Sequence, residues 1–234
     1  MSALRQDQAF RWRITSDSGA VHGLLLRALA NQPADWFRSV SPDHFSCYHG
    51  DLGRLLGCFR GDGALVAFGA LALDLPVVTD LGSLLGVDAA TLCVLDGSAV
   101  ERDWRGHGLH EGAIVERLRH AVALGCSHAA ATVAPLNRYS LRGLLWMGFE
   151  LRRFDFVYGG LPRFVLYRPV IADLFRPHSQ EHAGPDQART WRHPDLSLAL
   201  DDLAAHRAAL ADGLVGYDCR QTPQGGGLVD YRRP

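Results

Sequence analysis

The hydrophobic pattern begins with polar and apolar alternation and then changes to a helical period. FRWRIT, at 10–15, alternates as a strand does, and GAVHGLLLRALAN, at 19–31, has helical spacing after a run of capping candidates at 16–18. We expect a helix-rich stretch to continue through Trp36 and Phe37. The first part of the chain is therefore predicted to be a strand followed by helix.

Two apolar runs then flank a glycine turn in residues 54–73. The turn is Gly61-Asp62-Gly63, a sequence typical of a hairpin, so two adjacent antiparallel strands are expected. The longest apolar run, ALVAFGALAL at 64–73, is shorter than the about 20 residues that a membrane-crossing helix needs. It is predicted to be a buried strand, and no membrane partner is expected.

The middle of the chain alternates strand and helix. TLCVLDGSAV, at 91–100, is predicted to be a strand that runs into a glycine-containing turn, and the apolar positions from Leu109 onward define one face of a helix ending near Gly125. Four further elements complete this unit: a strand at 128–134, a short helix at 137–148 after Pro135, and strands at 149–159 and 162–170.

The last third of the chain differs in composition. Residues 171–195 are polar, contain prolines and lack a period, so we expect a linker or long surface loop between a unit at 1–170 and an appendage at 196–234. Leu196, Leu200, Leu203 and Leu210 predict an amphipathic helix, and LVGYDCR and LVDYRRP predict a terminal hairpin. This hairpin can complete the chain's own sheet or a neighbour's, which leaves a homodimer open.

Composition and charge narrow the class of partner. The 234 residues are 47% apolar, enough to bury one good-sized core, and the formal net charge of −1 gives no electrostatic case for nucleic acid or a membrane surface. The five cysteines are an odd number, widely spread, and the start of the chain lacks the pattern of a secretory leader. We expect a cytoplasmic protein with a small-molecule partner.

The stretch VERDWRGHGLHEGAI, at 100–114, carries the first candidate chemistry. Gly106 and Gly108 allow positive φ and close backbone approach, and the helix that follows begins with unpaired N–H groups, so a phosphate is the natural ligand. A P-loop is excluded because no GxxxxGK[ST] run exists, and a dinucleotide GxGxxG is excluded because the third glycine position is Glu111.

A second segment, at 137–149, indicates which kind of phosphate ligand the turn binds. The strand, the turn RDWRGHGLH, the helix, the next strand and NRYSLRGLLWMGF at 137–149 together resemble the acetyl-coenzyme A binding core of the GNAT acetyltransferases, over roughly 92–170. In that family a Q/R-x-x-G-x-G/A turn follows a bulged strand, and N-x-x-[AS] … G-F follows the next strand. The resemblance implies a mixed α/β fold (α+β), with a mostly antiparallel sheet, one parallel pair at the cofactor gap and helices on both faces.

The resemblance also implies a site for acetyl-coenzyme A. The pyrophosphate would bind the N–H groups of the turn at 105–110, and the pantetheine arm would lie between two diverging strands like an inserted strand. Ser98 and Val100 would offer strand N–H groups to a developing oxyanion, and Asn137 would hold the arm from the other side, although it can equally be a helix cap. The residues of the turn are Arg105, Gly106, His107, Gly108, Leu109 and His110.

The sequence departs from the family pattern in two places. Read from Arg105, the turn motif keeps Gly108 but ends in His110 rather than Gly or Ala; read from Asp103, it keeps Gly106 and Gly108 but lacks the opening Gln or Arg. Leu144 stands where many members have the tyrosine that protonates the thiolate. Ser140, with Tyr139 beside it, is the nearest substitute, although a free thiol of pKa about 8.5 can leave without a dedicated acid.

The general base is the least determined residue. Asp96 is the first candidate because alternation puts it on the same side of the strand as Ser98 and Val100; a carboxylate that only satisfies neighbouring N–H groups is the competing interpretation. Glu101 is the second candidate, unless it is merely a solvated charge in the turn.

The function implied is transfer of an acetyl group from acetyl-coenzyme A to a primary amine, by direct attack through a tetrahedral intermediate. A small-molecule amine is the first expectation; a protein or peptide amine, and a non-catalytic acyl-coenzyme A sensing module, stay open as alternatives. No metal is expected, because HSQEH at 178–182 lies in a polar stretch between prolines and the turn histidines lack a completing ligand set.

Overall fold

A single ten-stranded sheet forms the frame of the protein. The computed structural model describes residues 10–170 and 193–234. All neighbouring strands in the sheet are antiparallel except β4 and β5, which confirms the expected mixed sheet with one parallel pair. In spatial order the strands are β1 (Arg11–Ile14), β2 (Gly53–Phe59), β3 (Leu65–Ala72), β4 (Leu92–Val100), β5 (His128–Val133), β7 (Leu161–Pro169), β6 (Glu150–Val157), β9 (Val215–Gln221), β10 (Gly227–Arg232) and β8 (Leu196–Ala199).

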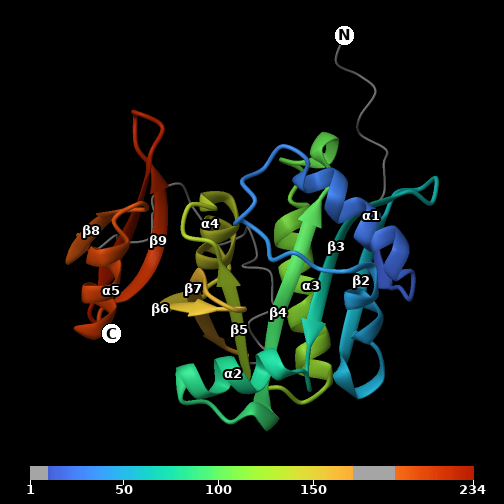
Figure 1. Cartoon of the computed structure of the whole chain (residues 1–234), viewed down its shortest axis with the longest axis horizontal. Coiled ribbons are helices and arrows are strands. Elements are labelled where there is room, and N and C mark those ends of the chain that lie inside the picture. Colours follow the sequence, from blue (N-terminus) through green and yellow to red (C-terminus); the bar gives the residue numbers. More distant parts are fainter. Residues whose placement is uncertain (1–9, 171–192) are drawn as a thin grey trace, which may run out of the picture.

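Helices cover both faces of this sheet (Figure 1). The α-helices are α1 (Ser18–Leu29), α2 (Pro76–Leu85), α3 (Leu109–Ala123), α4 (Arg138–Trp146) and α5 (Leu203–Ala211). Short 3₁₀ helices are η1 (Pro42–Cys47), η2 (Gly50–Leu52), η3 (Ala89–Thr91) and η4 (Arg102–Trp104). Side chains of α1, α2 and η1 form one buried cluster with the sheet, side chains of α3, α4 and α5 form a second, and a smaller third cluster joins Leu109 of α3 to β2 and β3. No helix within 10–170 or 193–234 is long and apolar enough to cross a membrane.

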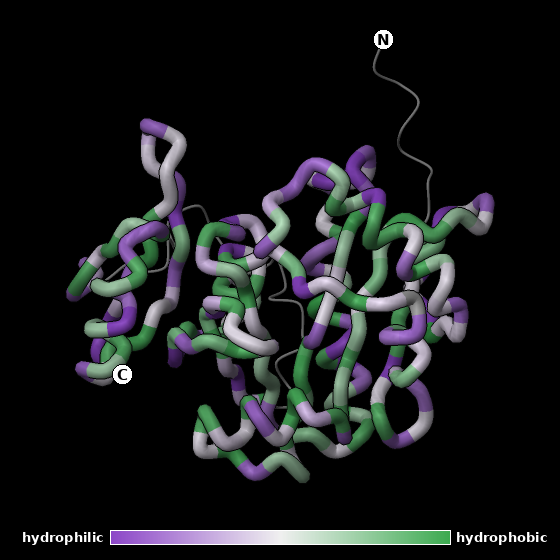
Figure 2. Tube along the Cα trace, in the orientation of Figure 1, coloured by the Kyte–Doolittle hydropathy of each residue, from purple (hydrophilic) through white to green (hydrophobic). Residues whose placement is uncertain are grey.

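Strand residues supply most of the core, as the hydrophobic segments of the central sheet in Figure 2 show. Leu71, Cys93 and Leu95 face the α3 side, whereas Ala70, Val94 and Phe68 face the α1 side. Because both faces of the central strands are covered, these strands are continuously apolar rather than alternating.

Local signals account for the main boundaries. The Asp17 carboxylate caps α1 by accepting a hydrogen bond from the N–H of Ala20 at 2.8 Å, and Gly63 gives the β2–β3 turn its φ of 85°. The strand at 10–15, the hairpin in 54–73, the helix from Leu109 and the terminal hairpin are all present, each within a few residues of the expected bounds.

Three elements differ from the expectation. Trp36 and Phe37 lie in an irregular segment rather than a helix, and both residues line a cleft. Helix α2 has no counterpart in the expectation, although Pro76 at its first turn and the left-handed Gly86 at its end are ordinary helix boundaries. Residues 196–199 form strand β8 instead of the start of the last helix, because they pair with β10 and the Asp202 cap delays α5.

The C-terminal elements extend the same sheet. Strand β9 joins β6, with Gly216 opposite Leu151, and a Cβ at residue 216 would lie 3.0 Å from the Leu151 Cβ. His206 of α5 and Tyr231 of β10 are buried and share a hydrogen bond at 2.6 Å. Most of the expected linker, residues 171–192, lies outside the described residues, so the division at 171–195 stays a prediction.

Candidate active site

The parallel strands β4 and β5 separate partway along their length. Their pairing begins at Leu92 with His128 and ends at Leu95 with Ala131, whereas β4 continues beside β3 to Val100 and β5 continues beside β7 to Val133. A cleft that is partly open to solvent begins where the pairing stops. The expected gap between diverging strands is therefore present, next to a helical α3.

A β-bulge at Asp96 decides which side chains enter the cleft. On β3, Ala70 pairs with Gly97 and Leu71 pairs with Leu95, so Asp96 has no partner residue. The extra residue reverses the alternation of side chains beyond it. Asp96 therefore shares the α1 face with Gly97, whose Cβ would meet Phe37 at 3.1 Å.

Ser98 consequently faces the opposite side from Asp96. Its partner on β3, Gly69, faces α3, because a Cβ there would meet the Arg117 side chain at 2.9 Å. Val100 packs with Leu109 on this α3 face too. The expectation that Asp96, Ser98 and Val100 point to one side is therefore wrong, because regular alternation does not hold across a bulge.

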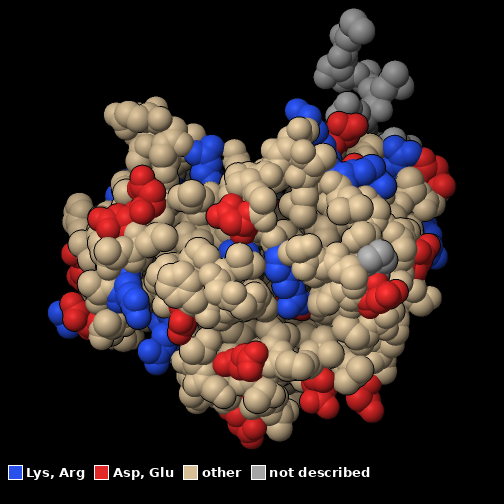
Figure 3. Space-filling model, viewed as in Figure 1, with Lys and Arg blue, Asp and Glu red and all other residues tan. Residues whose placement is uncertain are grey.

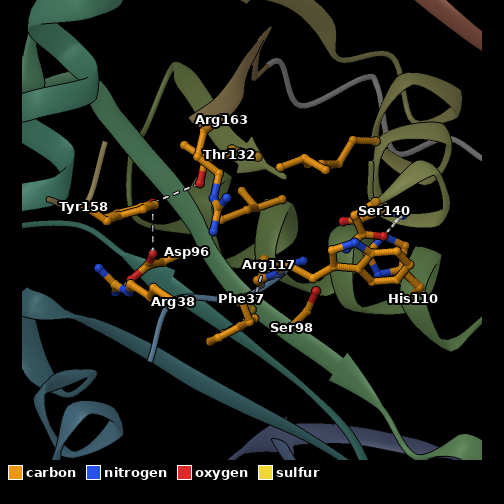
Figure 4. Close-up of a pocket in the computed structure, with 17 residues that line it drawn as sticks. Phe37, Arg38, Asp96, Ser98, His110, Arg117, Thr132, Ser140, Tyr158 and Arg163 are labelled. Atoms are coloured by element: carbon orange, nitrogen blue, oxygen red, sulfur yellow. Dashed lines mark hydrogen bonds and ion pairs between the residues drawn. The ribbon is translucent and has the colours of Figure 1, made fainter. Parts of the chain in front are cut away.

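The Asp96 carboxylate is buried and already bonded. Its side chain is 2% exposed; one oxygen accepts hydrogen bonds from the Tyr48 hydroxyl and, at 2.6 Å, from the Arg38 guanidinium, and the Tyr158 hydroxyl lies 3.5 Å from the other. His44 Nε2 lies 3.9 Å from the same carboxylate. Figure 4 shows Arg38, Asp96 and Tyr158 grouped on one side of the cleft. Asp96 is thus an ion-paired acceptor rather than an isolated base.

The groups around Asp96 keep their protons or stay neutral. Burial, together with the Asp96 charge, raises the pKa of Tyr48 well above its usual range and raises that of Tyr158 to about 12. Burial and the Arg38 charge lower the pKa of His44 despite the opposing effect of Asp96. Tyr158 has a left-handed φ of 54°, a sparsely populated conformation for a bulky residue, which turns its ring toward Thr132 at a hydroxyl separation of 2.9 Å.

The glycine turn has the backbone that its sequence predicts. Gly106 and Gly108 have φ of 78° and 70°, and nothing lies within 4 Å of a Cβ built on either. Among the hydrogen bonds of the described residues, none uses the N–H of Gly106, His107 or Gly108 as donor. Free N–H groups at an open helix start form an anion-binding arrangement.

The other residues of the turn have separate surroundings. The Arg105 guanidinium donates to the Ala28 carbonyl at 2.7 Å, which ties the turn to α1, while His107 is exposed. Leu109 is buried. His110 points away from the turn and into the cleft, where a Cβ on Gly143 of α4 would meet its ring at 2.6 Å.

Charged residues, among them Arg117 and Glu111, lie near the His110 ring. Its Nε2 is buried and has no hydrogen-bond partner among the described residues. Burial, followed by the nearby Arg117 charge, lowers the pKa of His110 to about 4, so the ring is neutral at physiological pH.

Asn137 and Ser140 both line the cleft from the start of α4. The Asn137 side chain caps the helix by accepting from the Ser140 N–H at 3.2 Å, and the Ser140 hydroxyl has no partner among the described groups. Leu144, at the position of the family tyrosine, is buried and also reaches the cleft. Tyr139 is 66% exposed and lies outside it, and Glu101 is paired with Arg27 at 2.9 Å.

Two buried arginines in the cleft were not anticipated. Arg117 is 2% exposed on α3 and Arg163 is 3% exposed on β7. Arg117 lies on the apolar face of α3 that Ile114, Leu118 and Ala121 define. A charged residue at that position of the helical pattern could have indicated a buried charge from the sequence. Arg163 gave no such signal, because its strand position alone does not reveal what lies above it.

Charge elsewhere on the molecule is mixed. Acidic and basic side chains are interspersed over the face drawn in Figure 3. Within the part of the chain that the structure describes, no group of three or more His, Cys, Asp or Glu residues could hold a metal ion. The HSQEH segment at 178–182 lies outside the described residues.

Comparison with solved structures identifies the fold. The chain is similar to a GCN5-related N-acetyltransferase from Kribbella flavida, with a TM-score of 0.54 and 15% identity over 69% of this chain and 98% of that one. It is similar to a GNAT superfamily phosphinothricin acetyltransferase from Sinorhizobium meliloti in complex with AcCoA, with a TM-score of 0.51 and 15% identity over 70% and 88% of the two chains.

A third similar structure is a chain of the NatC complex bound to Gag peptide and CoA, with a TM-score of 0.54 and 12% identity over 69% and 99% of the two chains. No protein-family model matches the sequence, and no curated protein matches it. The fold is therefore that of the GNAT acetyltransferases, as the motifs at 92–170 led us to expect, and the likeness at these identities concerns the fold alone.

Proposed function

We propose that this protein is an acetyl-coenzyme A dependent N-acetyltransferase that acts on a primary amine of a small molecule. The observation that carries the proposal is the separation of β4 from β5 after Leu95 and Ala131, combined with a turn after β4 in which the N–H groups of Gly106 to Gly108 have no partner among the described groups. One feature suits an amide-rich arm and the other suits a pyrophosphate, and coenzyme A contains both in series.

The fit of the donor rests on backbone rather than on side-chain charge. Helix α3 starts at Leu109 after the left-handed Gly108, so its first N–H groups point toward the open turn. Asn137, on the opposite side of the cleft, retains its side-chain NH₂ as a donor after capping α4 through its oxygen. Bound acetyl-coenzyme A would supply an activated thioester carbonyl.

The strand edge beside the gap would serve the reacting carbonyl. The Glu101 N–H donates to the Val66 carbonyl of β3 at 2.9 Å, so alternation turns the N–H groups of Ser98 and Val100 toward the other edge of β4. Donors fixed in a strand need no rearrangement as negative charge develops on an oxygen.

Asp96 and Ser140 are the candidates for proton transfer. An attacking amine must lose a proton, and Asp96 is the buried carboxylate at the cleft, already holding Arg38 and Tyr48. Ser140, whose hydroxyl has no partner among the described groups, is the candidate to donate a proton to the leaving thiolate. Because Asp96 is so strongly bonded, it would take the amine proton through a water molecule, or directly after the Tyr48 hydroxyl shifts toward His44 Nε2, which lies 3.2 Å from that hydroxyl.

A matched pair of glycine variants tests donor binding. Gly108→Asp introduces backbone strain and negative charge at the proposed pyrophosphate site, and Gly86→Asp introduces the same change at another open, positive-φ glycine, at the end of α2. Acetyl-coenzyme A at 100 times its Kd should stabilise the wild-type protein and Gly86→Asp by about 2.7 kcal/mol in thermal unfolding. Stabilisation of Gly108→Asp to the same extent would contradict the proposed site.

A non-catalytic acyl-coenzyme A module is the second candidate. Two observations favour it: Leu144 is a buried apolar side chain where the family places a tyrosine, and Asp96 is already ion-paired with Arg38. Thiol release from acetyl-coenzyme A across a panel of amines separates the two, because the sensing module binds coenzyme A without amine-stimulated turnover.

A further inference from the structure

The cleft holds more positive charge than its described surroundings neutralise. Arg38 is matched by Asp96 at 2.6 Å, but no carboxylate of the described residues lies within 4.0 Å of the Arg117 or Arg163 guanidinium. Both side chains are almost fully buried, and burial of an unpaired guanidinium is costly. An anion that entered the cleft would offset that cost.

Neutral groups only partly satisfy these arginines. Arg163 donates to the Pro162 carbonyl at 2.9 Å, and Arg117 donates to the Ala113 carbonyl at 2.8 Å and more distantly to Gly97 and Ala70. Burial lowers the pKa of Arg163, with Tyr158 and then Asp35 opposing it, and Asp35 is an exposed residue. Figure 4 shows Arg163 and Arg117 between the Asp96 group and the pair His110 and Ser140.

The balance of donors and acceptors in the cleft points the same way. Trp36 Nε1 is a buried donor with no partner among the described groups, and an indole can only donate. A guanidinium likewise has no acceptor atom, whereas Asp96, the carboxylate that lines the cleft, is already bonded. Trp36 and the two arginines therefore leave donor capacity unused, and the complement of these donors is a group rich in acceptors.

We infer that the cleft binds a carboxylate carried into it by one of the two reactants, with Arg163 as its main partner and Trp36 and Arg117 supporting it. A planar carboxylate accepts two parallel N–H bonds from a guanidinium, which would use the nitrogens that Arg163 leaves open. This inference rests on the proposed acetyltransferase function for the identity of the reactants. The carboxylate can belong to the amine acceptor, as in an amino acid, or to the acyl group of a dicarboxylic acyl thioester.

Matched substrates identify the source. Thiol release is followed with acetyl-coenzyme A and a panel of α- and ω-amino acids, each paired with its own carboxamide, and with succinyl-coenzyme A and neutral amines. Loss of a hydrogen bond to a charged group predicts a preference of about 10- to 100-fold in kcat/KM for the carboxylate member of a pair. If acceptors show no such preference, succinyl-coenzyme A is expected to exceed acetyl-coenzyme A by a similar factor.

Arginine variants tie the preference to the cleft. Arg163→Met should abolish it, and Arg163→Lys should retain part of it because the charge stays while the forked geometry is lost. Arg168→Met is the matched control: Arg168 is 7% exposed on the same strand β7 but bonds Met147 outside the cleft, so that variant should keep the full preference. Should Arg163→Met fail to fold by circular dichroism, the comparison of Arg163→Lys with wild type decides.

The possible results separate this inference from the proposed function. Thiol release that is equally fast for carboxylates, carboxamides and both thioesters, or a preference that Arg163→Met leaves intact, overturns the carboxylate site while leaving the acetyltransferase standing. If no thiol is released at all, succinate is added to the protein with coenzyme A, against sodium chloride at equal ionic strength. A thermal shift specific to succinate and lost in Arg163→Met then supports the site, and its absence overturns it.

Discussion

Replacement of His110 by glutamine gives the sharpest test of the site as a physical environment. The imidazole lies between α3 and Gly143 of α4, with Nε2 buried and without a partner among the described groups. Burial first, and the Arg117 charge second, lower the pKa of His110 from 6.5 to about 4. Glutamine keeps a polar side chain of similar reach but cannot take up a proton in this range.

The magnitude follows from proton linkage. Because the folded-state pKa lies below the unfolded value, the unfolded chain binds the proton more readily between pH 6.5 and 4. The contribution of neutral His110 to the free energy of unfolding is complete above pH 6.5 and is lost as the pH falls toward 4. The wild-type protein should therefore lose about 2 kcal/mol relative to His110→Gln between pH 7.5 and pH 5, and about 3 kcal/mol by pH 4.

Urea unfolding at pH 7.5 and pH 5, in the absence of ligand, measures the free energy of unfolding of wild type and His110→Gln. The predicted quantity is the change, between the two pH values, in the difference between the two proteins. His44 and His206 also have lowered pKa values, chiefly through burial, but they titrate in both proteins and cancel. His107→Gln is the control, because it removes an exposed ring without changing the cleft. A gap between wild type and His110→Gln that is the same at both pH values would refute the buried, neutral assignment.

Three further variants follow from packing, pairing and capping. Gly143→Ala places a Cβ 2.6 Å from the His110 ring and should lower the free energy of unfolding by about 1 to 3 kcal/mol; an unchanged Tm would mean that the ring moves freely. Asp96→Asn leaves Arg38 without its carboxylate and should lower the free energy of unfolding by about 3 kcal/mol. It should also abolish amine-dependent thiol release, and retained turnover would exclude Asp96 from proton transfer. Asp17→Ala removes the cap of α1 and should cost about 1 kcal/mol in urea unfolding while leaving coenzyme A binding intact.

The glycine turn and its flanking elements could be anticipated because their causes are local. Positive φ at Gly106 and Gly108 is a property of the residues themselves, and the helix from Leu109 is encoded by the spacing of its apolar side chains. The Asn137 cap likewise needs only a side chain three residues before the N–H that it accepts. Such features depend on neighbours along the chain, so a single sequence reveals them.

The contents of the cleft could not be anticipated in the same way. The face on which Asp96 lies depends on the register between β3 and β4, which a one-residue bulge reverses. Its partners Arg38, Tyr48 and Tyr158 come from segments 48 to 62 residues distant in sequence, and no local pattern relates them. Arg163 lines the cleft only because β7 pairs with β5, and that pairing could not be inferred from the residues around position 163.

By itself, then, the sequence determined the order of the central elements and the conformation of the glycine turn at 106–108, and its resemblance to a known family implied the parallel pair of strands. The tertiary structure alone decided that the pairing of β4 with β5 stops at Leu95 and that Asp96 is neutralised by Arg38. It also decided that Arg117 and Arg163 are buried with no carboxylate of the described residues close to either guanidinium. The reason is physical: backbone conformation follows from steric limits within a few residues, whereas burial and charge balance are set by groups that only the folded chain brings together.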